Sequence, residues 1–318
     1  MNETRTLHVV LGASGGAGSA ILEALGEAGL PARGVNRSGR PGRVPAEVEW
    51  VVADLADPAA LARAVAGAAV VHMAAQPAYH RWPQEFPAML DAVVAATAAQ
   101  SARLVMVDNL YAYGPGASPM CESSPQRATD PKGRVRAALS DRLLAEHRAG
   151  RVEVVIGRAS DYFGPHGENS GITALAIAPV SGTGALRWVG RLDVPHSCAY
   201  LPDVGRAFVL LGTAPDVTGR IWHLPHAPAV TGAQFLGMVN DALPTPRPAK
   251  RLGMGMLRVA APFHRISKET LSIAYQWTEA FVVDDREFRA RFPDFEVTPL
   301  DAAVARTVAR QRSRAAAA

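Results

Sequence analysis

The glycine-rich segment LGASGGAG (residues 11–18) constrains the fold of this chain more than any other part of its sequence. It follows an apolar run rich in β-branched residues and opens a helical pattern, so it marks a strand–turn–helix junction. Glycines spaced three apart allow a tight turn, the close approach of a pyrophosphate and tight packing of helix on strand. The helix N-terminus adds amide donors and positive potential. We therefore predict a dinucleotide site rather than a merely tight turn. The predicted contacts are Gly12, Ser14, Gly15, Gly16, Ala17 and Gly18.

Short apolar runs alternate with helical patterns through the first half of the chain. Strands are expected over residues 6–12, 33–37, 48–55, 69–75, 103–109 and 152–160, and helices over 18–29 and near 58–66, 84–100 and 133–149. This alternation predicts an α/β fold, a Rossmann-like doubly wound parallel sheet with helices on both faces. Such sheets bind ligands beyond the carboxyl ends of their strands.

The pattern changes after residue 165, where glycine and proline become frequent and the helical patterns less regular. We expect a dinucleotide-binding Rossmann domain over residues 1–165. A smaller, mixed substrate-binding lobe with C-terminal helices is expected over 166–318. Residues 203–225, with a helical pattern over 203–212 and an isolated strand over 220–225, are expected to return to the first domain.

Composition excludes several classes of protein. No apolar run is long enough to span a bilayer, and the start of the chain lacks the basic region and cleavage site of a signal peptide. The two cysteines, Cys121 and Cys198, are too few for a disulfide framework, which favours a reducing cytoplasm. The net charge is only +4 and the arginines are dispersed among acids, so we expect no nucleic-acid partner. No metal-ligand spacing is present. We expect a small-molecule substrate.

The segment VNRSGR, at the end of the second expected strand, bears on the choice of cofactor. A carboxylate at this place would bind the adenosine ribose of NAD, and none is present. Two guanidinium groups can instead pair with a 2′-phosphate, so NADP(H) is favoured and NAD(H) stays possible. The alternative is a solvated basic loop. The residues concerned are Asn36, Arg37, Ser38 and Arg40.

These features resemble the extended short-chain dehydrogenase/reductase family, which includes the NAD-dependent epimerases and dehydratases. The motifs that carry the likeness are the glycine loop, VVHMAA (70–75), AYGP (112–115), GRASDYFGP (157–165), and FVVDDREFRARF (281–292) with TPLDAAVARTVA (298–309). The resemblance implies further cofactor contacts from Asp54, Leu55, Met73, Ala74 and Ala75. Asp54, at the end of the third expected strand, could reach the adenine amino group, or it could cap a helix or a turn. The resemblance also implies a homodimer built through the helices near 84–100 and 133–149.

The resemblance places the family's Tyr-x-x-x-Lys motif in DPKGRVRAALSDRLLAEH (130–147), where this chain differs. Lys132 stands in the tyrosine position and Arg136 in the lysine position. Asp108 and Asn109 stand where the family carries its catalytic serine or threonine. The Ser/Tyr/Lys triad is therefore absent, and the chain is an atypical member of the family.

Asp130 and Pro131 suit the start of a helix, yet Lys132, Arg134 and Arg136 follow at its positive end. The neighbouring cations and the dipole would disfavour the charged form of Lys132, which would then be a usable acid or base. The alternative is a solvent-exposed helix start with tolerated charges.

Other predicted roles complete the catalytic site. Tyr111 is a second candidate for proton transfer, and Asn109 could orient a substrate oxygen. Arg136 cannot exchange a proton near neutral pH but could contact the ribose or a phosphate. Asp108 would be a base only if it were buried near the nicotinamide. The weaker candidates are Tyr113, expected to be structural, Tyr162 and His166.

The substrate is expected to differ from the nucleotide-sugars of many family members. Asp161 and, approximately, His196 replace the asparagine and arginine that hold the diphosphate in those relatives. A carboxylate beside a diphosphate is repulsive. The methionine-rich segment 253–264 would suit a less charged substrate, or could be a buried or dimer-facing helix.

We therefore expect an NADP(H)-dependent oxidoreductase that transfers hydride at a carbonyl carbon of a small organic molecule. One alternative is an epimerase or dehydratase that cycles its cofactor internally. Another is a regulatory protein that senses NADP(H) without catalysis.

Overall fold

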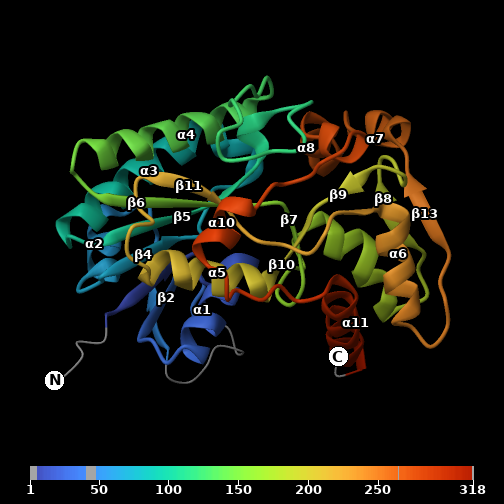
Figure 1. Cartoon of the computed structure of the whole chain (residues 1–318), viewed down its shortest axis with the longest axis horizontal. Helices are drawn as coiled ribbons and strands as arrows, with labels where there is room; N and C mark the ends of the chain where they lie inside the picture. The colour runs from blue at the N-terminus through green and yellow to red at the C-terminus, as the bar shows by residue number, and fades with distance from the viewer. Residues whose placement is uncertain (1–5, 41–47, 264, 317–318) are drawn as a thin grey trace. The chain divides into compact units, whose positions relative to one another are not determined.

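The computed structural model describes residues 6–40, 48–263 and 265–316 (Figure 1). Residues 1–5, which enter the expectation about a signal peptide, and residue 264 of the methionine-rich segment lie outside the described residues. The chain divides into two compact units. The first unit comprises Met1–Asn109, Val135–Arg158 and Val204–Leu224, and the second comprises Leu110–Arg134, Ala159–Asp203 and Pro225–Ala318.

The first unit is built on a seven-stranded sheet in the order β11-β6-β5-β4-β1-β2-β3. Its strands are β1 (His8–Leu11), β2 (Ala32–Asn36), β3 (Glu49–Val52), β4 (Val70–Met73), β5 (Arg103–Asn109), β6 (Glu153–Ala159) and β11 (Arg220–His223). The sheet is parallel, and β1 and β4 are buried along their whole length. Continuous apolar strands of this kind are expected where helices cover both faces.

The strand order reverses at β1, so crossovers before and after this point lie on opposite faces of the sheet. Figure 1 shows α3 and α4 on one side and α1 and α5 on the other. The helices are α1 (Gly16–Glu27), α2 (Pro58–Val65), α3 (Trp82–Ala99), α4 (Pro131–Arg148) and α5 (Leu201–Thr213). The predicted Rossmann-like α/β fold is confirmed. The strand expected near 220–225 is not isolated, because β11 pairs in parallel with β6 at the edge of the sheet.

In its described residues, the second unit has three two-stranded sheets and helices of 4 to 17 residues. Its strands are β7 (Asp161–Phe163), β8 (Leu186–Val189), β9 (Pro195–His196), β10 (Cys198–Tyr200), β12 (Val230–Thr231) and β13 (Ala249–Leu252). Its helices are α6 (Gly232–Asp241), α7 (Met254–Ala260), α8 (Arg265–Ser272), α9 (Tyr275–Thr278), α10 (Arg286–Arg291) and α11 (Leu300–Ala316). Within the described residues, no helix combines the length and the apolar character needed to cross a membrane.

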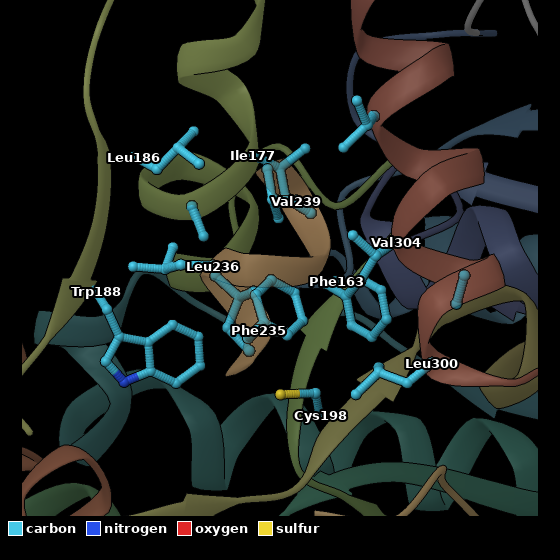
Figure 2. Packing of buried hydrophobic residues seen from close by; sticks show 14 of the residues in the cluster. Phe163, Ile177, Leu186, Trp188, Cys198, Phe235, Leu236, Val239, Leu300 and Val304 are labelled. Carbon is cyan, nitrogen blue, oxygen red and sulfur yellow. The ribbon is translucent and has the colours of Figure 1, made fainter. Parts of the chain in front are cut away.

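An aromatic and aliphatic cluster forms the core of the second unit (Figure 2). Phe163 and Phe235 meet edge to face, with ring centroids 5.4 Å apart. The ring centroids of Trp188 and Phe235 are 5.5 Å apart, and Val304 of α11 packs in the same cluster. This core joins segments that are far apart in the sequence. The second unit depends on it for stability, because isolated two-stranded sheets are at best marginally stable in water.

The core of the first unit contains a pair of histidines. His8 and His72 are fully buried, and Nδ1 of His8 lies 3.0 Å from Nε2 of His72. Burial, with the charge of Arg103 adding to it, lowers the pKa of His8 to about 4. Burial also lowers the pKa of His72 well below its ordinary value, and His8 adds to the shift. Both rings are therefore neutral near pH 7.

Candidate functional site

The glycine loop closes tightly over the end of β1. Gly12 has a φ of +82°, and a Cβ there would lie 2.6 Å from the backbone nitrogen of Ala75. A Cβ on Gly18 would lie 2.3 Å from the carbonyl oxygen of Gly12. Neither position can accept a side chain without moving backbone atoms. The glycines thus allow the loop to approach β4 and α1 to approach the loop, as predicted.

The N-terminus of α1 is open to a ligand. Its N-cap is Gly15, which has no side chain to accept from the amides of the first turn, and that turn contains no acidic residue. Uncapped first-turn amides and the helix dipole suit a phosphate group. Of the other predicted contacts in the loop, Ser14 is exposed, Gly16 is half-buried and Ala17 is buried, so Ala17 could contribute only through its backbone.

The end of β2 presents two arginines to solvent. Arg37, Ser38 and Arg40 are exposed. Asn36 is buried and shapes the turn: its Nδ2 donates to the carbonyl oxygen of Gly39 at 2.9 Å, and its Oδ1 accepts from the Gly39 amide at 2.9 Å. The side chain of Asn36 is therefore committed to the turn, while the guanidinium groups face outward.

The residues after β3 and β4 line the same end of the sheet. Asp54 is exposed, and its Oδ1 accepts from the Ala56 amide at 3.0 Å. This is the turn-capping alternative, although the second carboxylate oxygen is not used in that contact. Leu55 and Met73 are buried. Ala74 and Ala75 are half-buried, and their backbone atoms lie against Gly12.

A buried cluster of two arginines and one carboxylate links β5, β6 and α4. The Oδ1 of Asp108 accepts from Arg136 at 3.2 Å, and its Oδ2 accepts from Nε of Arg158 at 2.8 Å. Arg158 also donates to the hydroxyl of Ser140 at 2.7 Å. All four side chains are at most 4% exposed. Asp108 is buried, as a catalytic base would need to be, but both of its oxygens bind guanidinium groups.

Arg136 makes further contacts that fix its orientation. Its Nη2 donates to Oε1 of Gln76 at 2.7 Å. The guanidinium lies over Trp82 at 4.4 Å and over Phe86 at 4.8 Å from the ring centroids. These stacking contacts stabilise a cation that has left water. Arg136 is thus part of the packing between helix and sheet, and its contact with a ribose or phosphate stays a prediction.

Lys132 is buried at the start of α4, within the second unit. Its Nζ lies 2.5 Å from Oε2 of Glu269 and donates to the hydroxyl of Ser272 at 2.7 Å. The alternative of an exposed helix start is therefore wrong for Lys132, which is 4% exposed, and holds only for Arg134. Glu269 and Ser272 lie one turn apart on α8. No motif in the sequence connects them with Lys132.

The first turn of α4 lies against the segment that contains Tyr111. A Cβ on Gly133 would lie 2.4 Å from the carbonyl oxygen of Tyr111. Asp130 caps this turn as predicted, since its Oδ1 accepts from the amides of Lys132 and Gly133 at 3.0 Å and 2.9 Å. The structure thus brings the segments of Lys132 and Tyr111 together.

The remaining candidates differ in exposure. Tyr111 and Tyr113 are buried, and Tyr113 packs in a small cluster with Phe281 and Val283. Asn109 is half-buried at the end of β5. Tyr162 and His166 are half-buried in the second unit.

Asp161 and His196 form a hydrogen-bonded pair. Nε2 of His196 lies 2.9 Å from Oδ2 of Asp161, and its Nδ1 lies 3.1 Å from the carbonyl oxygen of Gln276. Each ring nitrogen of His196 therefore faces an oxygen atom that can accept a hydrogen bond. The imidazole is stacked on Trp277 at 4.6 Å and on Phe281 at 5.2 Å. The Asp161 side chain is 21% exposed, so it presents an acceptor at the surface of the second unit.

The methionine-rich segment is only partly covered. Met254 and Leu257 pack against the core of the second unit, whereas Met256, Val259 and Phe263 are exposed. The segment is therefore not buried within one chain, and the alternative of a dimer-facing helix stays a prediction. Among the side chains that the structure describes, no group of three or more His, Cys, Asp or Glu residues could hold a metal ion.

Comparison with protein families identifies one match, to the model of the NAD dependent epimerase/dehydratase family, over residues 8–224. That match covers more than half of the chain and includes every strand of the seven-stranded sheet. Comparison with curated proteins finds no match.

Solved structures share the fold at low sequence identity. A nucleoside-diphosphate-sugar epimerase from Pseudomonas aeruginosa is 20% identical with a TM-score of 0.77, and the match covers 98% of this chain and 99% of that one. The Thermus thermophilus UDP-glucose 4-epimerase in complex with NAD is 19% identical with a TM-score of 0.76, covering 96% and 99%. The dTDP-glucose 4,6-dehydratase from Bacillus anthracis, also in complex with NAD, is 12% identical with a TM-score of 0.77, covering 97% and 96%.

Proposed function

Because the chain belongs to the NAD-dependent epimerase/dehydratase family, a family of enzymes, we propose that it is an NADP(H)-dependent oxidoreductase acting on a small organic substrate. The reaction is hydride transfer at a carbonyl or alcohol carbon. The observation that carries this proposal is the glycine loop, closed on Ala75 at one side and leading to the uncapped N-terminus of α1 at the other. When bound, the nicotinamide supplies or accepts the hydride.

Preference for NADP(H) rests on the end of β2. Arg37 and Arg40 are exposed there, and the segment from Asn36 to Arg40 contains no carboxylate. A 2′-phosphate would gain charge-assisted hydrogen bonds from either guanidinium. An NAD ribose would lack the acid that usually accepts from its 2′-hydroxyl.

Proton transfer is assigned to Lys132 or Tyr111. Lys132 would donate a proton from its side-chain nitrogen to a carbonyl oxygen, and Glu269, 2.5 Å from that nitrogen, would help to hold it in place. Asn109, at the end of β5, would orient the substrate oxygen. Arg136 stays protonated and would act only through its charge and hydrogen bonds.

The substrate is proposed to lack a nucleoside diphosphate. The half-buried carboxylate of Asp161 is held in place by His196, and a diphosphate beside it would be repelled. A neutral or cationic group with hydrogen-bond donors would suit this acceptor. We propose that the protein acts in the cytoplasm as a homodimer, consistent with the free thiols of Cys121 and Cys198.

The proposal is tested by fluorescence titration of cofactor-stripped protein with NADPH and NADH at fixed salt. NADPH is expected to bind at least about tenfold more tightly, since one charge-assisted contact contributes about 1.5–3 kcal/mol. Arg37→Gln should weaken NADPH far more than NADH, whereas Arg63→Gln on α2 should change neither. Equal losses for both cofactors would refute the NADP(H) preference. No binding of either would refute the oxidoreductase assignment.

An epimerase or dehydratase with internal cofactor cycling is the second candidate. It is favoured by the structural similarity to the Thermus thermophilus epimerase and the Bacillus anthracis dehydratase, whose structures hold NAD. Cofactor copurifying at equal stoichiometry, with turnover but no net change in nicotinamide absorbance, would favour it. Cofactor binding without any turnover would instead favour a sensing protein.

A further inference from the structure

A small cavity in the second unit lies beside α11. It is lined by the loop that follows β7, by Thr173 at the start of the π-helical turn η3 (Thr173–Ile177), and by one face of α11. On the same side of α11, nearer the start of the helix, Leu300 and Val304 pack into the hydrophobic core shown in Figure 2. The part of α11 that lines the cavity is different in character, because it carries Arg310 and Arg314 one helical turn apart.

The two arginines differ in how their charges are balanced. Arg314 forms an ion pair with Glu168 and lies in the last turn of α11, where the helix dipole also favours a cation. Arg310 lies one turn further from the helix end. In the part of the chain that the structure describes, no carboxylate forms an ion pair with it. Arg310 is thus a half-buried cation without an ion-pair partner of its own, because Glu168, the carboxylate that lines the cavity, pairs with Arg314.

The contact between Arg310 and His166 does not supply that anion. Nη2 of Arg310 lies 3.1 Å from Nε2 of His166. A guanidinium can only donate, so Nε2 accepts this hydrogen bond, and an imidazole ring carries no negative charge that could balance the arginine. His166 therefore orients Arg310 at the cavity without neutralising its charge.

A second observation points to a ligand. Thr173 lines the same cavity and is 3% exposed, and its hydroxyl has no hydrogen-bond partner among the described residues. Buried hydroxyl groups are almost always paired, because an unpaired one loses its hydrogen bonds to water. A ligand oxygen in the cavity would accept from the Thr173 hydroxyl and from Arg310 together.

We propose that this cavity binds a small oxyanion of the phosphate type, either inorganic phosphate or the phosphate group of a small monoester. Arg310 would supply the charge and charge-assisted hydrogen bonds, and Thr173 would donate a further hydrogen bond. Arg314 would add positive potential that Glu168 partly offsets. All of these residues belong to the second unit, whereas the glycine loop belongs to the first unit.

The test is calorimetric titration of the full chain with inorganic phosphate and, in parallel, with glycerol 3-phosphate, at low ionic strength. Saturable binding with a Kd in the millimolar range or below is expected for at least one probe, and the tighter probe identifies the source of the phosphate. Arg310→Gln should weaken binding at least tenfold, and Thr173→Val about threefold. Arg312→Gln, an exposed arginine on the same helix, should leave the Kd within twofold.

Two controls make each outcome decisive. Phosphate binding should be unchanged in Arg37→Gln, which separates this site from the cofactor loop. Arg310→Lys keeps the charge and should retain partial binding if Arg310→Gln proves poorly folded by circular dichroism. Absence of saturable binding for both probes would overturn the proposal, and so would binding that Arg310→Gln and Arg312→Gln weaken equally.

Discussion

Gly18 shows at the scale of one residue how the cofactor loop is built. Its Cα faces the Gly12 carbonyl so closely that a Cβ would lie 2.3 Å from that oxygen and 2.9 Å from the carbonyl carbon. These are backbone atoms and cannot swing away as a side chain could. By contrast, Gly26, near the end of the same helix, has no atom within 4 Å of such a Cβ. Alanine substitutions at Gly18 and Gly26 therefore form a matched pair of variants: the added methyl group overlaps backbone atoms at Gly18 and meets nothing at Gly26.

Gly18→Ala is expected to destabilise the protein by about 1–3 kcal/mol, as overpacking does, and to weaken cofactor binding. Gly26→Ala is expected to stabilise it by about 0.5–1 kcal/mol, because alanine favours the helix. Urea denaturation of both variants measures the difference. Equal midpoints for the two variants would show that the loop does not pack as described.

The neutral histidine pair in the first unit makes stability depend on pH. The folded state holds the pKa of His8 at about 4, whereas the unfolded chain has the ordinary value of 6.5. Between these values the unfolded state binds more protons, so the free energy of unfolding falls as the pH falls. The contribution is fully present above about pH 6.5 and is lost toward pH 4. For His8 alone it amounts to roughly 3 kcal/mol.

The double variant His8→Asn, His72→Asn should flatten this pH dependence. Asparagine does not titrate, so the slope between pH 6.5 and 4 should decrease even if the absolute stability also drops. Urea denaturation at several pH values measures the slope. As a control, His80→Asn removes an exposed histidine and should leave the slope as in the wild type. A double variant with the wild-type slope would mean that other groups cause the acid sensitivity.

At the scale of one element, α4 explains the unusual charge pattern at its start. Its first cation, Lys132, is offset by Glu269 and Ser272. Arg134 is exposed, and Arg136 binds Asp108 and stacks on aromatic rings. Each cation therefore has a different environment. The interaction with the helix dipole costs about 0.3–1 kcal/mol per exposed charge, and the contacts of Lys132 and Arg136 offset this cost for those two residues.

If α4 supplies the proton donor, Lys132→Ala should lower kcat by about 100-fold or more while NADPH binding stays close to the wild-type value. Tyr111→Phe is the parallel test of the second candidate. Lys132→Arg serves as the matched variant, since arginine keeps the charge but cannot exchange a proton near neutral pH. These rates are measured with a carbonyl substrate identified by screening. Full turnover in both Lys132→Ala and Tyr111→Phe would remove both residues from the mechanism.

At the scale of the whole molecule, α3 and α4 lie on one side of the sheet (Figure 1). They are connected by an ion pair between Asp91 and Arg142, whose charged atoms are 2.8 Å apart and whose side chains are 42% and 48% exposed. Such an exposed pair contributes little to the stability of one chain. Ala138 on α4 is also exposed, which leaves small and polar groups on this face.

The predicted homodimer uses these two helices, so Ala138→Glu should shift the protein to the monomer. A buried like-charge pair across a two-fold interface would be strongly unfavourable. Light scattering during size exclusion measures the mass, expected to be twice that of one chain for the wild type. Ala305→Glu, an exposed alanine on α11, should remain dimeric. A monomeric wild type at micromolar concentration would contradict the prediction.

Much of the first unit could be predicted because its signals are local. Strand β5 lies at residues 103–109 as expected, and α1, α2 and α3 begin within two residues of the predicted positions. β3 is shorter than expected, because only Glu49–Val52 pair with β2 and the chain then turns at Asp54. The second unit could not be predicted in this detail, since its two- to four-residue strands carry too few residues for a periodic pattern.

The same distinction holds for the candidate site, in which the local features could be predicted from the sequence and the long-range contacts could not. The spacing of the glycines and the absence of a carboxylate after β2 are properties of consecutive residues, so the sequence by itself determined the cofactor loop and its basic flank. The partners of the buried charges were decided only by the tertiary structure. Glu269 lies 137 residues from Lys132, Arg158 lies 50 residues from Asp108, and Arg310 lies 144 residues from His166. No local pattern encodes such pairs, because a charge is buried beside whichever group packing brings to it.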